Sequence, residues 1–475
     1  MLKKLFSDIY IYTLPTILSR GVSFLILPIY TRILSTSDYG ILDLIMVFGN
    51  LVNLTVSLEI SQGIARFYPD EKDVSKQKLY TSSAFWFSSF CYTLFLVVTL
   101  SFSHSLSNLI LQDSNRVLIF RIGLVYIFFN GLVYFLQSQL RWEFRSKQYA
   151  ILSIVVSFSI AIGSVFLGYF LNWKLHGVLL GMLIAHLIGY IYGIIVLRES
   201  IDLRVDLDSL SQMLRFSIPL VPAGIAVFIS TYIDRMMINH FLSLDEVGIY
   251  SLGFRLASIT TLIIIGFQRA LTPLIYSHYS EEDTPRHLAL IFRLFIAISL
   301  IFILCISIFS KETLWLIADP NYYSASTVIV FLALSILFAN MYIFTPGISI
   351  FKRSYIIFWI NFTGAALNVV FNWLLIPTYG FMGAAFATLL GSIFVFLAYL
   401  VFSQRFYYVP HSWRQIGIGT LFIAIACIFG SSINFSIPLT LFLKVLLVVG
   451  AITFLLWIKL ISIGEIRSFI RPDRS

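Results

Sequence analysis

Three arginines stand inside long apolar stretches of this sequence and are the residues best suited to hold a charged ligand. They are Arg20 in the first apolar stretch and Arg235 and Arg255 in two stretches of the second half. An arginine at the middle of a bilayer costs about 2.5–3.5 kcal/mol, which an aqueous cavity or an anionic partner would offset. Guanidinium groups grip phosphate oxygens in pairs, so the pattern predicts binding of an anionic substrate by these residues.

Each arginine also has a structural interpretation. Arg20 could extend to the membrane surface or pair with Asp43 or Glu59, and Asp234 could neutralise the adjacent Arg235. Both interpretations stay open at the level of sequence.

Carboxylates in the same stretches offer a second kind of chemistry. Asp43, Glu59 and Asp234 are the acidic residues predicted to lie within spans. Burial favours the protonated form of a carboxylate, so these three are candidates for coupling to a proton or sodium gradient. A static ion pair with a nearby arginine is the alternative for each of them.

Amides form a third set. Asn50 and Asn53 share one face of a predicted helix, as their spacing of three residues requires. Amide side chains could bind sugar hydroxyls, and they could equally form hydrogen bonds between helices.

The elements that must position these residues are membrane helices. The chain has 475 residues, of which 59% are hydrophobic and 12% charged, with a mean hydropathy of +0.91. A span needs roughly 20 apolar residues. The net charge of +9 fits cytoplasmic membrane faces better than nucleic-acid binding.

Fourteen apolar runs predict fourteen spans. They cover residues 10–34, 41–66, 79–103, 117–140, 149–171, 175–197, 213–242, 247–277, 288–309, 325–350, 355–376, 380–403, 414–433 and 438–461. Lysine and arginine gather in alternate connections, whereas the opposite connections hold Arg32, Arg116, Lys174 and Lys311. This asymmetry predicts that both termini lie in the cytoplasm.

The sequence also repeats itself. The turn from Ser35 to Gly40 returns as Ser243 to Gly248, each with a serine three residues before an acid, which is the pattern of a capped helix start. Related echoes predict two six-helix lobes in parallel orientation, related by a pseudo-two-fold axis along the membrane normal, and two further helices. We expect lobes at residues 1–205 and 206–405, followed by a C-terminal helix pair and tail at 406–475.

Missing motifs narrow the function. No lysine follows a glycine, so the chain has no phosphate-binding loop for ATP. Cys91, Cys305 and Cys427 lie in apolar runs without the spacing of metal ligands. We therefore expect neither a metal site nor a bound cofactor, and the short predicted outer loops argue against an enzyme such as a membrane-embedded glycan polymerase or ligase.

Short motifs in a fixed order give the sequence a family resemblance. They are Arg32-Ile-Leu-Ser35, Asp38-Tyr-Gly40, Ala65-Arg-Phe-Tyr-Pro69, Asp234-Arg235, Glu246-Val-Gly248-Ile-Tyr250 and Arg255. In these motifs and in its helix plan, the chain resembles the polysaccharide flippases of the multidrug/oligosaccharidyl-lipid/polysaccharide (MOP) exporter superfamily. The resemblance implies an all-α, V-shaped bundle of fourteen helices around a central cavity.

It further implies a flippase that moves undecaprenyl-diphosphate-linked oligosaccharides across the bacterial inner membrane for O-antigen, capsule or exopolysaccharide synthesis. Arg20 and Arg255 would then grip the diphosphate while the lobes alternate in access. The implied partners are the lipid-linked substrate, membrane lipid, and polymerase and glycosyltransferase machinery, with no role for nucleic acid. A lipid II flippase and a cation-coupled multidrug exporter of the same superfamily are the alternatives.

Overall fold

The fold is all-helical, as predicted. The structure, a computed structural model, describes residues 21–433 and 435–460, and it contains no strand within them. Twelve described helices are long and apolar enough to cross a membrane, and thirteen are if the bent pair Thr36–Thr55 and Ile60–Phe67 counts as one span. These thirteen match predicted runs two to fourteen. The first run, 10–34, falls partly outside the described residues, where Gly21–Ile33 is a shorter apolar helix, so the count of fourteen is not confirmed.

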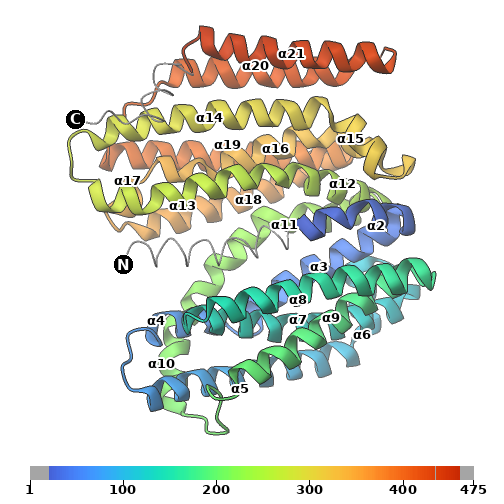
Figure 1. The fold of residues 1–475 in the computed structure, drawn as a ribbon, viewed down its shortest axis with the longest axis vertical. Coiled ribbons are helices and arrows are strands. Elements are labelled where there is room, and N and C mark those ends of the chain that lie inside the picture. Colours follow the sequence, from blue (N-terminus) through green and yellow to red (C-terminus); the bar gives the residue numbers. More distant parts are fainter. Residues whose placement is uncertain (1–20, 434, 461–475) are drawn as a thin grey trace. The chain divides into compact units, whose positions relative to one another are not determined.

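Contacts divide the chain into two compact units, Met1–Gly248 and Ile249–Ser475. The main helices of the first unit in Figure 1 are α2 (Leu27–Ile33), α3 (Thr36–Thr55), α4 (Ile60–Phe67), α5 (Val74–Ser101), α6 (Ser103–Leu111), α7 (Val117–Trp142), α8 (Ser146–Val165), α9 (Lys174–Leu197), α10 (Leu207–Ser217) and α11 (Val221–Phe241). Helix α12 (Leu244–Ala257) runs across the division. The predicted lobes, with boundaries at 205 and 405, stay a prediction.

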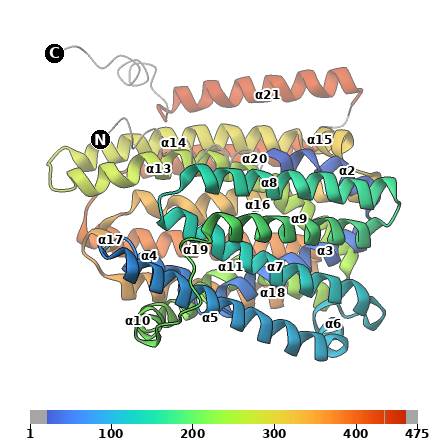
Figure 2. The same cartoon turned by 60° about the horizontal axis from the view of Figure 1, so that its bottom comes forward.

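The second unit follows the same plan. Its main helices are α13 (Thr261–His278), α14 (Thr284–Ile308), α15 (Ser310–Ile317), α16 (Ser326–Asn340), α17 (Gly347–Ile350), α18 (Ser354–Tyr379), α19 (Phe381–Phe406), α20 (Trp413–Ser432) and α21 (Ile437–Trp457). In the first unit, α9 packs against α8 and α7, which lie side by side with it in Figures 1 and 2. In the second, α19 packs against α18 and α16. The repeat detected in the sequence therefore appears as a repeated packing arrangement.

The repeated turns lie against each other. The Ser35 side chain caps α3 by accepting from the Asp38 N–H at 3.1 Å, and the Ser243 side chain accepts from the Glu246 N–H at 3.3 Å, as the capping pattern predicts. A Cβ atom at Gly40 would lie 2.1 Å from the Leu244 carbonyl oxygen, so only glycine permits this approach. The contact fixes the start of α3 near the start of α12.

One predicted span is not continuous. The run 41–66 is broken between α3 and α4 by a bend of 47°. Leu58 and Glu59 have φ angles of 51° and 53° there, in the left-handed region. A residue other than glycine in this region destabilises the folded state by on the order of 1–3 kcal/mol. The sequence gives no sign of this break, because no proline or glycine stands at it.

Candidate functional site

Three predicted site residues form one buried cluster in the first unit. The Arg235 Nε donates to Asp43 Oδ2 at 3.1 Å, and its Nη1 donates to Asp234 Oδ1 at 2.8 Å. The Arg235 side chain is 2% exposed, that of Asp234 3% and that of Asp43 18%. We call Asp43, Asp234 and Arg235 the triad.

The surroundings of Arg235 fix its orientation. Its Nη1 also donates to the Thr231 carbonyl oxygen at 2.9 Å, one turn back on α11. Its guanidinium carbon lies 5.3 Å from the centre of the Tyr232 ring, within range of a cation–π contact. The guanidinium group is therefore held by two carboxylates, a carbonyl and an aromatic ring.

The local fold explains how the triad assembles. Asp43 lies two turns into α3 from the Ser35 cap, on a helix that packs against α11, which carries Asp234 and Arg235. The close contact of Gly40 with Leu244 fixes the position of α3 along its axis, relative to the segment that follows α11. This arrangement joins residues 192 positions apart.

In the triad, two carboxylates share one guanidinium group, and each of the three residues makes further interactions as well. This geometry matches the static ion pair with a nearby arginine that the sequence offered as the structural interpretation. Ion binding by Asp43 and Asp234 stays a prediction.

A second polar chain crosses the first unit. The Asn53 Nδ2 donates to Asn130 Oδ1 at 2.8 Å, and the Tyr92 hydroxyl donates to Asn53 Oδ1 at 3.2 Å. Asn130 Nδ2 lies 3.1 Å from His186 Nε2, while His186 Nδ1 lies 2.8 Å from the Met182 carbonyl oxygen. This network assigns a neutral imidazole with its proton on Nδ1. Asn53 therefore links α3, α5 and α7 in this conformation, as interhelical bonding would require.

The remaining predicted residues lie apart from the triad. Asn50 is exposed, and Arg255 is half-buried in α12. Glu59 is half-buried at the break between α3 and α4 and hydrogen-bonds to Gln62. Arg20 lies outside the described residues, so the predicted grip by Arg20 and Arg255 stays a prediction.

Sequence reasoning missed a buried ion pair in the second unit. Lys444 Nζ on α21 donates to Glu312 Oε1 on α15 at 2.5 Å. The Lys444 side chain is 0% exposed, and its Nζ lies 5.9 Å from the Phe309 ring centre. The sequence did hold a sign of this pair. Lys444 lies inside the last apolar run, and a charge within a membrane span needs a partner.

In the part of the chain that the structure describes, no group of three or more His, Cys, Asp or Glu side chains is arranged to hold an ion. The three cysteines are free thiols.

Comparison with known proteins identifies the class. Over residues 5–278 the chain matches the family described as polysaccharide biosynthesis protein, and over residues 219–374 it matches the MatE family. No curated protein sequence matches it.

Solved structures share the fold. The lipid II flippase MurJ, in an inward closed conformation, has a TM-score of 0.72 at 14% identity, with 97% of this chain and 99% of that chain covered. An inward-facing multidrug resistance transporter of the MATE family has a TM-score of 0.68 at 16% identity, covering 84% and 97%. A MOP superfamily transporter from Pyrococcus furiosus has a TM-score of 0.58 at 15% identity, covering 84% and 95%.

Fold and sequence thus define a multi-pass membrane transporter of the MOP superfamily. Within that class, the chain belongs to the polysaccharide biosynthesis protein family, whose match spans more than half of its length.

Proposed function

We propose that the protein is a flippase for undecaprenyl-diphosphate-linked oligosaccharides in the bacterial inner membrane, with both termini in the cytoplasm. The family match over residues 5–278 carries this proposal, because that family is one of polysaccharide biosynthesis. The product would enter O-antigen, capsule or exopolysaccharide synthesis, beside polymerase and glycosyltransferase machinery.

The transport mechanism we propose is alternating access. The diphosphate is drawn to Arg255 and Arg20, the glycan occupies the cavity and the prenyl tail stays in lipid. One carboxylate of the triad takes up a proton or sodium ion, which changes the charge balance between α3 and α11. Cation binding on one side of the membrane and release on the other would couple the gradient to the change of access.

A lipid II flippase is the second candidate. It is favoured by the likeness to MurJ over 97% of this chain. Both substrates carry a prenyl diphosphate, so the arginines suit either of them.

Reconstituted transport separates the candidates. Proteoliposomes would receive a lipid-diphosphate oligosaccharide, lipid II or an organic cation, and entry of each would be measured. We expect the first to be transported, and Arg255→Ala and Arg20→Ala to lose most of that transport. Arg32→Ala, which removes an exposed arginine, is the matched control and should transport normally.

The other outcomes each select a different function. Transport of lipid II alone would replace the proposal with the lipid II flippase, and export of the organic cation alone would make the protein a drug exporter. Full transport by both cavity-arginine variants would contradict the proposed diphosphate grip.

A further inference from the structure

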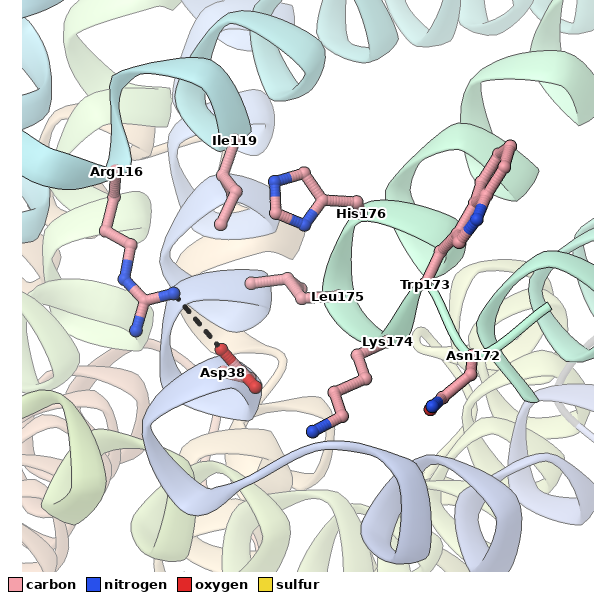
Figure 3. A pocket seen from close by; sticks show the side chains of 8 residues that line it. All are labelled: Asp38, Arg116, Ile119, Asn172, Trp173, Lys174, Leu175 and His176. Atoms are coloured by element: carbon pink, nitrogen blue, oxygen red, sulfur yellow. Dashed lines mark ion pairs between the residues drawn. The ribbon is translucent and has the colours of Figure 1, made fainter.

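A cavity of about 430 Å³ opens at one end of the first unit, where three helices begin. Asp38 lies in the first turn of α3, Arg116 just before α7, and Lys174 and His176 at the start of α9 (Figure 3). The charge pattern of the connections predicts that this is the outer end. We call this cavity the rim pocket.

The base of the rim pocket is apolar and its walls are polar. Ile119 and Leu175 are 3% and 2% exposed, and they lie among the polar side chains in Figure 3. Around them, Lys174, Arg116 and Asn172 supply hydrogen-bond donors, and Asp38 and Asn172 supply acceptors. A ligand with both hydroxyl groups and apolar C–H faces matches this lining.

The charges of the rim pocket balance once the acidic partner of Arg116 outside the lining is included. Arg116 Nη1 lies 3.7 Å from Asp38 Oδ1, and its Nε lies 3.4 Å from Asp113 Oδ2. Asp38 is the carboxylate of the lining, and Asp113 lies outside it. With Arg116 and Lys174, these four formal charges sum to zero. A multiply charged anion would meet the Asp38 carboxylate here, whereas an uncharged polyhydroxyl ligand meets no such repulsion.

Trp173 completes the lining. This residue is 50% exposed, and its indole stands on the side of the rim pocket away from Arg116 and Asp38 (Figure 3). An exposed indole presents a flat apolar face with a polar N–H, which suits the C–H face and hydroxyl edge of a sugar ring. Tyr169 and Phe170, in the preceding turn, are also exposed but do not line the pocket. A role as aromatic anchors at the membrane interface explains their exposure.

We propose that the rim pocket binds one or two uncharged sugar rings, with Trp173 as the stacking surface and Lys174 as a hydrogen-bond donor. The volume lies within the range of small-ligand pockets. The inference rests on the proposed function in one respect: the sugars would be those of the transported glycan, held at the outer end of the first unit.

Ligand-observed NMR on the full chain in phosphatidylcholine nanodiscs tests this directly. The probes are N,N′-diacetylchitobiose, maltose and lactose, with inorganic pyrophosphate as the anionic comparison. We expect at least one disaccharide to bind. Trp173→Ala should weaken its binding about fivefold, and Lys174→Met, which keeps the aliphatic stem, about tenfold.

Trp315→Ala is the matched control. Trp315 lies on α15, is 69% exposed and is outside the pocket lining, so sugar binding should not change. Thermal unfolding of all three variants should match wild type, which shows that a loss of binding is not a loss of folding.

The proposal would be overturned if none of the three disaccharides bound. It would also be overturned if a disaccharide bound equally well to wild type, Trp173→Ala and Lys174→Met. Binding of pyrophosphate but of no disaccharide, weakened by Lys174→Met, would make the rim pocket an anion site instead. Sugar binding by a protein that transports no lipid-linked oligosaccharide would leave the rim pocket in place and reject the flippase, so the two proposals fail separately.

Discussion

The triad and the Lys444–Glu312 pair are both buried charge clusters, but they differ in composition. In the triad, two carboxylates meet one guanidinium group, which joins α3 to α11. In the pair, one ammonium group meets one carboxylate in a balanced contact, which joins α21 to α15. In the mechanism proposed above, a carboxylate of the triad exchanges a cation during transport, whereas the balanced pair only fastens a helix.

Breaking the balanced pair should have the largest effect on stability. Glu312→Gln leaves the fully buried Lys444 without its carboxylate. We expect the free energy of unfolding to fall by about 3–5 kcal/mol, because α21 loses its ion pair with α15. Thermal unfolding in nanodiscs measures it. The double variant Glu312→Gln/Lys444→Met should recover most of the loss, and a double variant as unstable as the single one would contradict the account.

Removing Arg235 from the triad should have the second-largest effect on stability. Arg235→Gln removes the guanidinium group that Asp43 and Asp234 share, and we expect about 3 kcal/mol of destabilisation. Adding Asp43→Asn should restore about half of it, because one of the two facing charges is gone. A double-mutant cycle on unfolding temperature would show that coupling, and strictly additive effects would rule it out.

Asp43→Asn alone should separate stability from function. It leaves a one-to-one pair of Asp234 and Arg235, so unfolding should shift by less than about 1 kcal/mol. Transport driven by an ion gradient should nevertheless fall to the rate without a gradient. A strongly destabilised Asp43→Asn would instead make the triad a structural cluster like the Lys444–Glu312 pair.

A half-buried carboxylate gives the smallest expected effect. Asp206 caps α10 by accepting from the Ser209 N–H at 2.9 Å, and hydrogen bonds from Ser209 hold the pKa of Asp206 below its ordinary value. Because the folded pKa is lowered, the stabilisation is present at neutral pH and is lost as the pH falls below about 4. Asp206→Ala should cost about 1 kcal/mol at pH 7 and less at pH 3, whereas Asp206→Asn should cost little at either pH. Unfolding measured against pH distinguishes the two variants.

Sequence patterns predicted the helices well because each span is a local property. Runs of apolar residues marked spans two to fourteen, and the repeated serine caps of α3 and α12 marked two helix starts. The break at Leu58 and Glu59 was not predictable, since both residues commonly occur in helices and the bend depends on packing around them.

The partners within the sites were harder to predict for a similar reason. Helical spacing identified Asp43, Asp234 and Arg235 as charged residues in spans. It could not show that Asp43 contacts Arg235, which lies 192 residues away in the sequence. Helical spacing shows which side of its own helix a residue occupies, but not which other helix packs against that side. Asn130 and Lys444 were missed because their roles depend on partners from distant helices, which are Asn53 and His186 for Asn130 and Glu312 for Lys444.

The most direct test of ion coupling by the triad is gradient-driven transport of a lipid-diphosphate oligosaccharide in proteoliposomes. Wild type, Asp43→Asn and the double variant Glu312→Gln/Lys444→Met would be compared under imposed proton and sodium gradients. We predict that one of the gradients accelerates wild type and the double variant, and that neither accelerates Asp43→Asn. Equal acceleration of Asp43→Asn would show that the triad does not couple transport to an ion.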